Sequence, residues 1–105
     1  MAARTCTVEI DNARRARSQL PEVVRVLVEE LGVRRVILFG SLLDGRLHER
    51  SDIDLAVEGL APERYWEALW RCSKAAQRHV DLVPLGEASA SLRDHIRERG
   101  EVLYG

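Results

Sequence analysis

The chain has 105 residues, a formal net charge of -1, 46% hydrophobic residues and 31% charged residues. This length predicts a single domain, residues 1–105, that can bury a core without disulfides or a structural metal. The near-neutral charge gives no overall attraction to nucleic acid or to an acidic membrane, and the apolar stretches are too short to span a bilayer. Two isolated cysteines and the lack of an apolar signal region favour a reduced, cytoplasmic protein.

The N-terminal third predicts one helix after a segment with more than one interpretation. Thr5–Ile10 is compatible with a short strand or an extended arm, and Asp11–Arg17 with a helical turn. The arginines there are expected on a solvated helix face, and a basic patch for RNA is the alternative. Pro21–Leu31 is predicted as a helix because apolar residues recur at steps of three and four, with Pro21 in its first turn and Gly32 at its far end.

The central stretch contains two short apolar runs joined by a polar connection. The first run ends at Gly40-Ser41, and the second begins after Asp52-Ile53-Asp54. Such runs, bounded by turn residues, predict buried strands. A connection this short favours an antiparallel pair, which would bring Ser41 close to Asp52 and Asp54. The predicted strands are Arg35–Phe39 and Leu55–Val57.

The spacing of the two aspartates predicts a cation site. Along a strand, residues two apart project from the same face, so Asp52 and Asp54 point together while Ile53 points into the core. Two adjacent carboxylates resist ionising together, and a bound cation removes that penalty. Mg²⁺ accepts one or two carboxylates and takes its remaining ligands from water and phosphates. Gly40-Ser41 is suited to the phosphate end, because glycine lets a backbone approach closely and a helical turn after it aims N–H groups at an anion.

A second helix is predicted over Ala61–Arg78, with Pro62 at its start. Aromatic and apolar residues at helical spacing line one of its faces, and we expect that face in the core. A base-stacking surface or a partner interface is the alternative for its aromatic residues. The face comprises Tyr65, Trp66, Leu69, Trp70 and Ala76.

A third strand is predicted from the apolar run His79–Pro84, which contains one charged residue, Asp81. The preceding helix is long enough for a parallel crossover, which would place Asp81 beside Asp52 and Asp54. A carboxylate inside an apolar strand is costly unless it is paired or binds a ligand. Asp81 is therefore expected at the cation site, and a salt bridge to an arginine or a solvent-facing edge position is the alternative.

The C-terminal part predicts a polar helix over Ser89–Arg99, ended by Gly100, and a short edge strand over Glu101–Tyr104. Together the elements predict an α/β (α+β) fold. Its sheet would be mixed, with three to four strands and with helices packed on it.

Gly40-Ser41, ten intervening residues and then Asp52-Ile53-Asp54 resemble the nucleotidyltransferase superfamily with a DNA-polymerase-beta-like palm. The chain is most similar to the smallest members, the MNT-type antitoxins encoded beside HEPN-domain proteins, and the resemblance covers nearly all of it. It implies that Asp52 and Asp54 bind one or two Mg²⁺ ions. It also implies that Asp81 shares a metal and acts as, or orients, the general base. Gly40 and Ser41 would hold the terminal phosphates of ATP.

The same resemblance implies a function and a partner. The chain would transfer AMP from ATP to a tyrosine hydroxyl of a HEPN-domain toxin and so silence it. The alternative is a catalytically reduced palm that neutralises its partner by contact. Transfer to tRNA or to a small hydroxylated antibiotic is the weaker interpretation, because no basic, aromatic-laced surface is evident for nucleic acid. Self-association of the chain is left open.

One segment departs from the pattern of active MNT-type antitoxins, roughly Gly-Ser-x-Ala-Arg-Gly. Here Leu42-Leu43-Asp44 follows Gly40-Ser41, so an acidic residue stands where those relatives carry arginine. An acidic side chain there repels a triphosphate. Arg46 or Arg50 is a candidate substitute. The three histidines have no metal-ligand spacing and are expected as surface or packing residues; they are His48, His79 and His95.

Overall fold

A computed structural model of the chain describes residues 2–40, 42–43 and 52–105, and within these ranges the side chains from residue 11 onward. Four strands form one sheet in the order β3-β2-β1-β4. β1 is antiparallel to both β2 and β4, whereas β2 and β3 are parallel. The sheet is therefore mixed, as predicted. The strands are β1 (Arg35–Phe39), β2 (Ile53–Glu58), β3 (Val80–Pro84) and β4 (Glu101–Tyr104).

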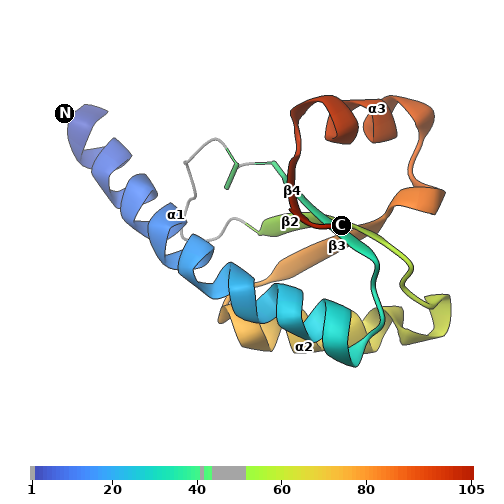
Figure 1. Cartoon of the computed structure of the whole chain (residues 1–105). Coiled ribbons are helices and arrows are strands. Elements are labelled where there is room, and N and C mark those ends of the chain that lie inside the picture. The colour runs from blue at the N-terminus through green and yellow to red at the C-terminus, as the bar shows by residue number, and fades with distance from the viewer. Residues whose placement is uncertain (1, 41, 44–51) are drawn as a thin grey trace.

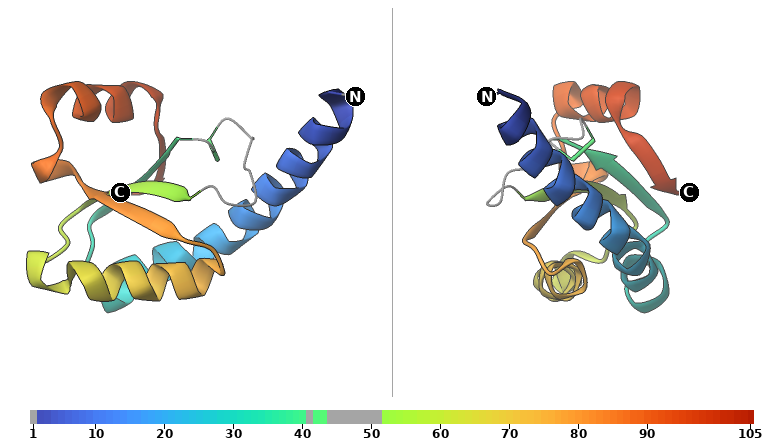
Figure 2. Two further views of the ribbon diagram at one scale, coloured as in Figure 1. Left: turned by 180° about the vertical axis from the view of Figure 1, so that it is seen from behind. Right: turned by 90° about the vertical axis from the view of Figure 1, so that its left-hand side faces the viewer.

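Helices cover both faces of this sheet, which gives the expected α+β fold. α1 and α2 lie side by side against one face, and α3 lies over the other, as Figures 1 and 2 show. None of the helices in the described ranges is both long enough and apolar enough to cross a membrane. The helical elements are α1 (Ala2–Arg25), the π-helical η1 (Val26–Glu30), η2 (Pro62–Arg64), α2 (Tyr65–Ala76), η3 (Leu85–Glu87) and α3 (Ala90–Arg99).

The main core lies between the sheet and the α1–α2 layer. Alternate strand residues point into it, as the two-residue period of a strand requires, and the buried apolar face of α1 and the small residues of α2 close it from the other side. The strand residues that contribute are Val36, Leu38, Ile53, Leu55, Val57, Val80 and Leu82. A smaller apolar cluster lies on the opposite face beneath α3 and comprises Ile37, Ala56, Leu85 and Ile96.

The N-terminal helix is longer than the sequence predicted. α1 runs from Ala2 to Arg25 and continues into η1, so the strand or arm over 5–10 is wrong, and the helical turn over 11–17 is part of a longer helix. Pro21 lies inside the helix, not in its first turn. Ala13, Ala16 and Leu20 are buried and extend the apolar face backward at steps of three and four. The packing of this face offsets the single backbone hydrogen bond that proline cannot donate.

The tryptophans of α2 are exposed, which contradicts the prediction that they belong to the core. Trp66 is 77% and Trp70 is 63% exposed, whereas Ala68, Cys72 and Ala76 are buried. α2 lies against both α1 and β3, and its small side chains allow that close approach. Burial raises the pKa of the Cys72 thiol to about 12, so this cysteine is an inert core residue.

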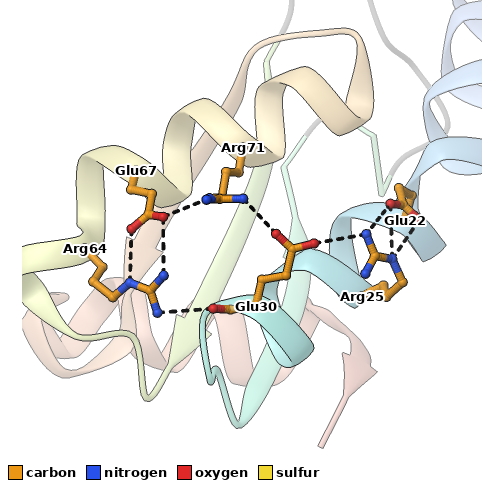
Figure 3. Close-up of polar contacts among 6 residues, drawn as sticks. All are labelled: Glu22, Arg25, Glu30, Arg64, Glu67 and Arg71. Carbon is orange, nitrogen blue, oxygen red and sulfur yellow. Dashed lines mark hydrogen bonds and ion pairs between the residues drawn. The ribbon is translucent and has the colours of Figure 1, made fainter.

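An ion-pair network on the surface joins η1 to α2 (Figure 3). Glu30 lies at its centre: one carboxylate oxygen is 2.8 Å from Arg71 Nη1, and the other is 3.1 Å from Arg25 Nη2. Arg64 donates to the backbone carbonyl of Glu30 at 3.1 Å. Glu67 bridges Arg64 and Arg71 along the helix. Single exposed pairs contribute little, but a connected set fixes how the two helices lie against each other.

Candidate active site

The turn after β1 is built against the carboxylate of Asp54. Phe39 is the register partner of Asp54, and Gly40 follows with a φ of +82°. A Cβ on residue 40 would lie 3.1 Å from Cγ and 3.2 Å from Cβ of Asp54, and closer still to Oδ2. Residue 40 must therefore be glycine for two reasons: the positive φ is unfavourable for other residues, and Asp54 occupies the space that a side chain would need.

Asp54 and Asp81 are direct register partners on the parallel strands β2 and β3. They project from the same face of the sheet as Ala56, which is the face that α3 partly covers. Both side chains belong to half-buried residues. The structure thus brings two of the predicted site carboxylates side by side, with Gly40 directly against one of them.

The electrostatics of this pair favour a bound cation. Burial, and then the negative charges of Asp81 and Asp52, raise the pKa of the Asp54 carboxyl above its ordinary value of 3.8. A half-buried carboxyl that faces two like charges is costly to ionise, and a divalent cation would remove that cost.

Asp52 lies just before β2, is exposed, and has a histidine neighbour. His79 Nδ1 is 3.1 Å from Asp52 Oδ1, and the N–H of Ile53 donates to the carbonyl of His79 at 3.0 Å. The sequence predicts a surface or packing role for His79 and does not indicate this contact. The contact follows from the register of the parallel strands: Ile53 pairs with Val80, so the residues that precede them lie close together.

The carboxylate oxygens at this site are of the type that Mg²⁺ prefers as ligands. No three His, Cys, Asp or Glu side chains within residues 11–40, 42–43 and 52–105 form a ready-made cluster. Asp54 and Asp81 supply adjacent oxygen ligands, and Asp52 lies two residues from Asp54. Mg²⁺ commonly needs only one or two carboxylates, because water and nucleotide phosphates complete its shell. The residues present therefore suit a metal that arrives with a nucleotide.

The segment after Gly40 is only partly described. Ser41, Asp44, Arg46 and Arg50 lie outside the described residues, as does His48. The N–H of Leu43 donates to the carbonyl of Gly40 at 3.2 Å, which closes a tight turn. Leu42 is fully buried in the main core. Leu42 thus packs against the main core and does not face solvent.

One cavity lies at the other end of the sheet. It has a volume of about 640 Å³ and is lined by residues that include Arg34, Val57, Trp66 and Pro84. Val57 and Pro84 are the register partners farthest along β2 and β3 from Asp54 and Asp81. We nevertheless place the candidate active site at the carboxylates and not at this cavity, because open clefts at helix ends are common and converging charged groups are not.

Comparison with known proteins points to one family. The family described as polymerase beta nucleotidyltransferase matches residues 22–105. The chain is 33% identical over 88 residues to the protein adenylyltransferase MntA of Shewanella oneidensis, covering 80% of this chain and 63% of MntA. The chain therefore spans less than two thirds of the length of that curated relative.

Solved structures agree with the sequence match. A toxin–antitoxin crystal structure with AMP-PNP has a TM-score of 0.70 and 31% identity, covering 80% of this chain and 72% of that one. A complex of the tri-AMPylated Shewanella oneidensis HEPN toxin with the MNT antitoxin has a TM-score of 0.68 and 26% identity, covering 86% and 72%.

Proposed function

We propose that this chain, which belongs to the polymerase beta nucleotidyltransferase family, transfers AMP from ATP to a protein hydroxyl as the antitoxin of a HEPN toxin–antitoxin pair. One observation carries the proposal: Asp54 and Asp81 lie directly opposite each other, with the strictly glycine-compatible turn at Gly40 against Asp54. The similarity to MntA, named a protein adenylyltransferase, supports the reaction class.

Each proposed site residue has a role in this reaction. Asp54 and Asp81, with Asp52, would hold Mg²⁺, and Gly40 and Ser41 would receive the terminal phosphates of ATP. Bound Mg²⁺ would neutralise the phosphate charge and lower the pKa of the attacking hydroxyl. The acceptor oxygen forms a bond to the α-phosphorus while the bond to pyrophosphate breaks, and Asp81 receives the hydroxyl proton.

The proposed partner is inferred from the related structures and from the position of the carboxylates in the sheet. Related structures are described as containing AMP-PNP in one case and a tri-AMPylated HEPN toxin in another. Asp54 and Asp81 lie near the starts of β2 and β3, at the end of the sheet where β1 ends. A HEPN-domain toxin in the cytoplasm would supply the acceptor hydroxyl, for which we propose a tyrosine.

Label transfer tests the proposal. The chain, its co-encoded HEPN protein, Mg²⁺ and ATP labelled at the α-phosphate are incubated together, and label on the HEPN protein is measured. We expect labelling with the natural sequence and a loss of at least about 100-fold with Asp54→Asn. Glu58→Gln, on the same strand and face but at the far end of β2, is the matched control and should label normally. Absence of label with the natural sequence would contradict the proposal.

The second candidate function is neutralisation of the toxin by binding alone, without transfer of AMP. Two features of the segment after Gly40-Ser41 favour this function. Leu42 is buried in the core and is therefore not available to bind a nucleotide. Asp44 stands where active MNT-type antitoxins carry an arginine. Co-expression with the toxin separates the two functions. Growth rescue that survives Asp54→Asn supports neutralisation by contact, whereas rescue that is lost with Asp54→Asn supports the transferase.

A further inference from the structure

The outer side of α2 carries an exposed apolar surface. Trp66 and Trp70, one helical turn apart, are 77% and 63% exposed, and they are the only tryptophans in the chain. Glu63 is exposed at the N-terminal end of this surface and Lys74 at its C-terminal end. We call these four residues the tryptophan face. Two large indoles one turn apart give α2 an exposed aromatic surface, and tryptophan is the residue type most enriched at binding hot spots.

The tryptophan face is separated from the proposed active site by the sheet itself. α2 packs on the face of the sheet that holds Leu55 and Leu82, whereas Asp54 and Asp81 project from the other face. Figures 1 and 2 show α2 at the side of the sheet away from α3. A protein that presents a hydroxyl to the carboxylates therefore does not need to cover the tryptophans, and a different occupant can bind there at the same time.

The charges of this face are arranged to match a second copy of themselves. Figure 3 shows Arg64, Glu67 and Arg71 of η2 and α2 engaged with each other and with Glu30 of η1. Glu63 and Lys74 stand outside that network. An acidic residue at one end of a face and a basic residue at the other end are self-complementary when two copies pair antiparallel, which is the arrangement of an isologous two-fold interface.

We propose that the chain forms a two-fold symmetric homodimer through antiparallel pairing of the tryptophan faces. With the axis midway between Glu63 and Lys74, Glu63 of each copy lies opposite Lys74 of the other, and the four indoles interleave between the two ion pairs. Lys74 Nζ lies over the ring of Trp70, 4.7 Å from its centre, so the cation is already held against the indoles. A groove of about 280 Å³ between α2 and η1, lined by Val26, Trp70 and Ala75 among others, receives the opposing indole edge.

The buried area indicates how stable this dimer is. A covered aromatic side chain contributes about 150–250 Å², so four indoles supply at least about half of the ~1,200 Å² that the smallest specific interfaces bury. The flanking charged residues and the groove walls supply the remainder. We therefore expect a dimer that dissociates in the micromolar range and not a permanent one.

Light scattering after size-exclusion chromatography, from low micromolar to several hundred micromolar, tests the proposal on the full chain. We expect conversion from monomer to dimer with rising concentration, and a blue shift of tryptophan emission over the same range, since both fluorophores lie on this face. Trp66→Ala/Trp70→Ala should raise the dissociation constant at least about 100-fold. Val102→Ala/Tyr104→Ala, which removes two exposed apolar side chains from β4, is the matched control and should leave it unchanged.

Charge reversal gives the sharper test. Glu63→Lys and Lys74→Glu should each weaken the dimer about 5–10-fold, and the double reversal should restore it, because the two charges face each other across the axis. A chain that remains monomeric, a dimer indifferent to the tryptophan substitutions, or a double reversal no better than the single ones would overturn the proposal. Loss of HEPN-protein binding in Trp66→Ala/Trp70→Ala, with the chain alone monomeric, would assign the face to that protein instead. Label transfer is measured separately, so failure of the dimer leaves the proposed reaction untouched.

Discussion

Side chains on the two faces of the sheet differ in kind. Toward α1 and α2, β1, β2 and β3 contribute apolar residues to one continuous buried core, and Leu103 of β4 packs against it. Toward α3, the apolar cluster is small, and its neighbours on β2 and β3 are Asp54 and Asp81. The first face holds the fold together, and the second carries a like-charge pair that folding alone would not favour. On β2, the face of a residue near the site therefore predicts its role: replacing Leu55 should damage stability, whereas replacing Asp54 should damage the chemistry.

Asp81→Asn gives the largest expected effect and falls on the chemical face. If Asp81 binds metal and takes the acceptor proton, the rate of AMP transfer should drop by about 10²–10⁴-fold. The midpoint of thermal unfolding should hardly move. Comparison of the transfer rate and the melting curve for one preparation measures both. A large loss of stability with Asp81→Asn would break the division between the faces.

Leu55→Ala tests the opposite face. Leu55 is fully buried one residue from Asp54, and its truncation should lower the free energy of unfolding by about 2–5 kcal/mol through lost burial and a cavity. Urea denaturation at a temperature where the variant folds measures the loss. Val102→Ala, at an exposed position, is the control and should change stability by less than about 0.5 kcal/mol.

Gly40→Ala tests the junction between the faces. A side chain at a φ of +82° is strained and displaces the Asp54 carboxylate, so we expect a loss of about 1–3 kcal/mol in stability together with reduced transfer. Gly86→Ala is the matched control, because a Cβ there meets nothing within 4 Å. If the two variants have the same free energy of unfolding and the same label transfer, residue 40 is an ordinary turn residue with no special role at the site.

His79→Ala sharpens the account at the exposed edge of the site. Losing the contact with Asp52 should weaken Mn²⁺ binding, measured by electron paramagnetic resonance in the presence of AMP-PNP, by about 3–10-fold, less than for a buried partner of a ligand. His79→Asn places an amide donor near the position of Nδ1 and should restore most of the affinity. Equal affinities in all three proteins would remove His79 from the site.

Asp54→Asn has a small expected effect on stability, and its sign is distinctive. Because the folded state raises the pKa of this carboxyl, the folded chain binds the proton more tightly than the unfolded chain. Stability therefore falls as pH rises from the ordinary value of 3.8 through the raised value. At neutral pH, Asp54→Asn should stabilise the fold slightly, because it removes the repulsion between this carboxylate and the negative charges of Asp81 and Asp52. Denaturation at acidic pH should show a smaller difference, and a destabilised variant at neutral pH would contradict the assignment.

The sequence predicted the strands because their signal is local. β1 was predicted at its observed bounds, Arg35–Phe39, since its apolar run ends at a glycine. β2 is longer than Leu55–Val57, because pairing with β3 extends it back to Ile53. The placement of Asp81 beside Asp54 followed from the crossover rule, which depends on topology and not on side-chain detail.

The features that the sequence missed depend on packing between distant elements. Either face of α2 could have been buried on hydrophobicity alone, and the large indoles made the wrong face more attractive. Contact with both α1 and β3 instead buries Ala68 and Cys72. Of the predicted face, Ala76 is buried and Tyr65 and Leu69 pack against the core, so only the two tryptophans were wrongly placed. The early turns of α1 were missed because Ala13 and Ala16 are weakly hydrophobic, although their spacing continues the apolar face.

Calorimetric titration with AMP-PNP, with and without Mg²⁺, tests most directly whether the carboxylate pair and Gly40 form a metal-dependent nucleotide site. The account predicts that Mg²⁺ tightens AMP-PNP binding to the natural sequence at least about 10-fold and does not do so in Asp54→Asn. Binding that is equally tight with and without Mg²⁺, or unchanged in Asp54→Asn, would contradict it.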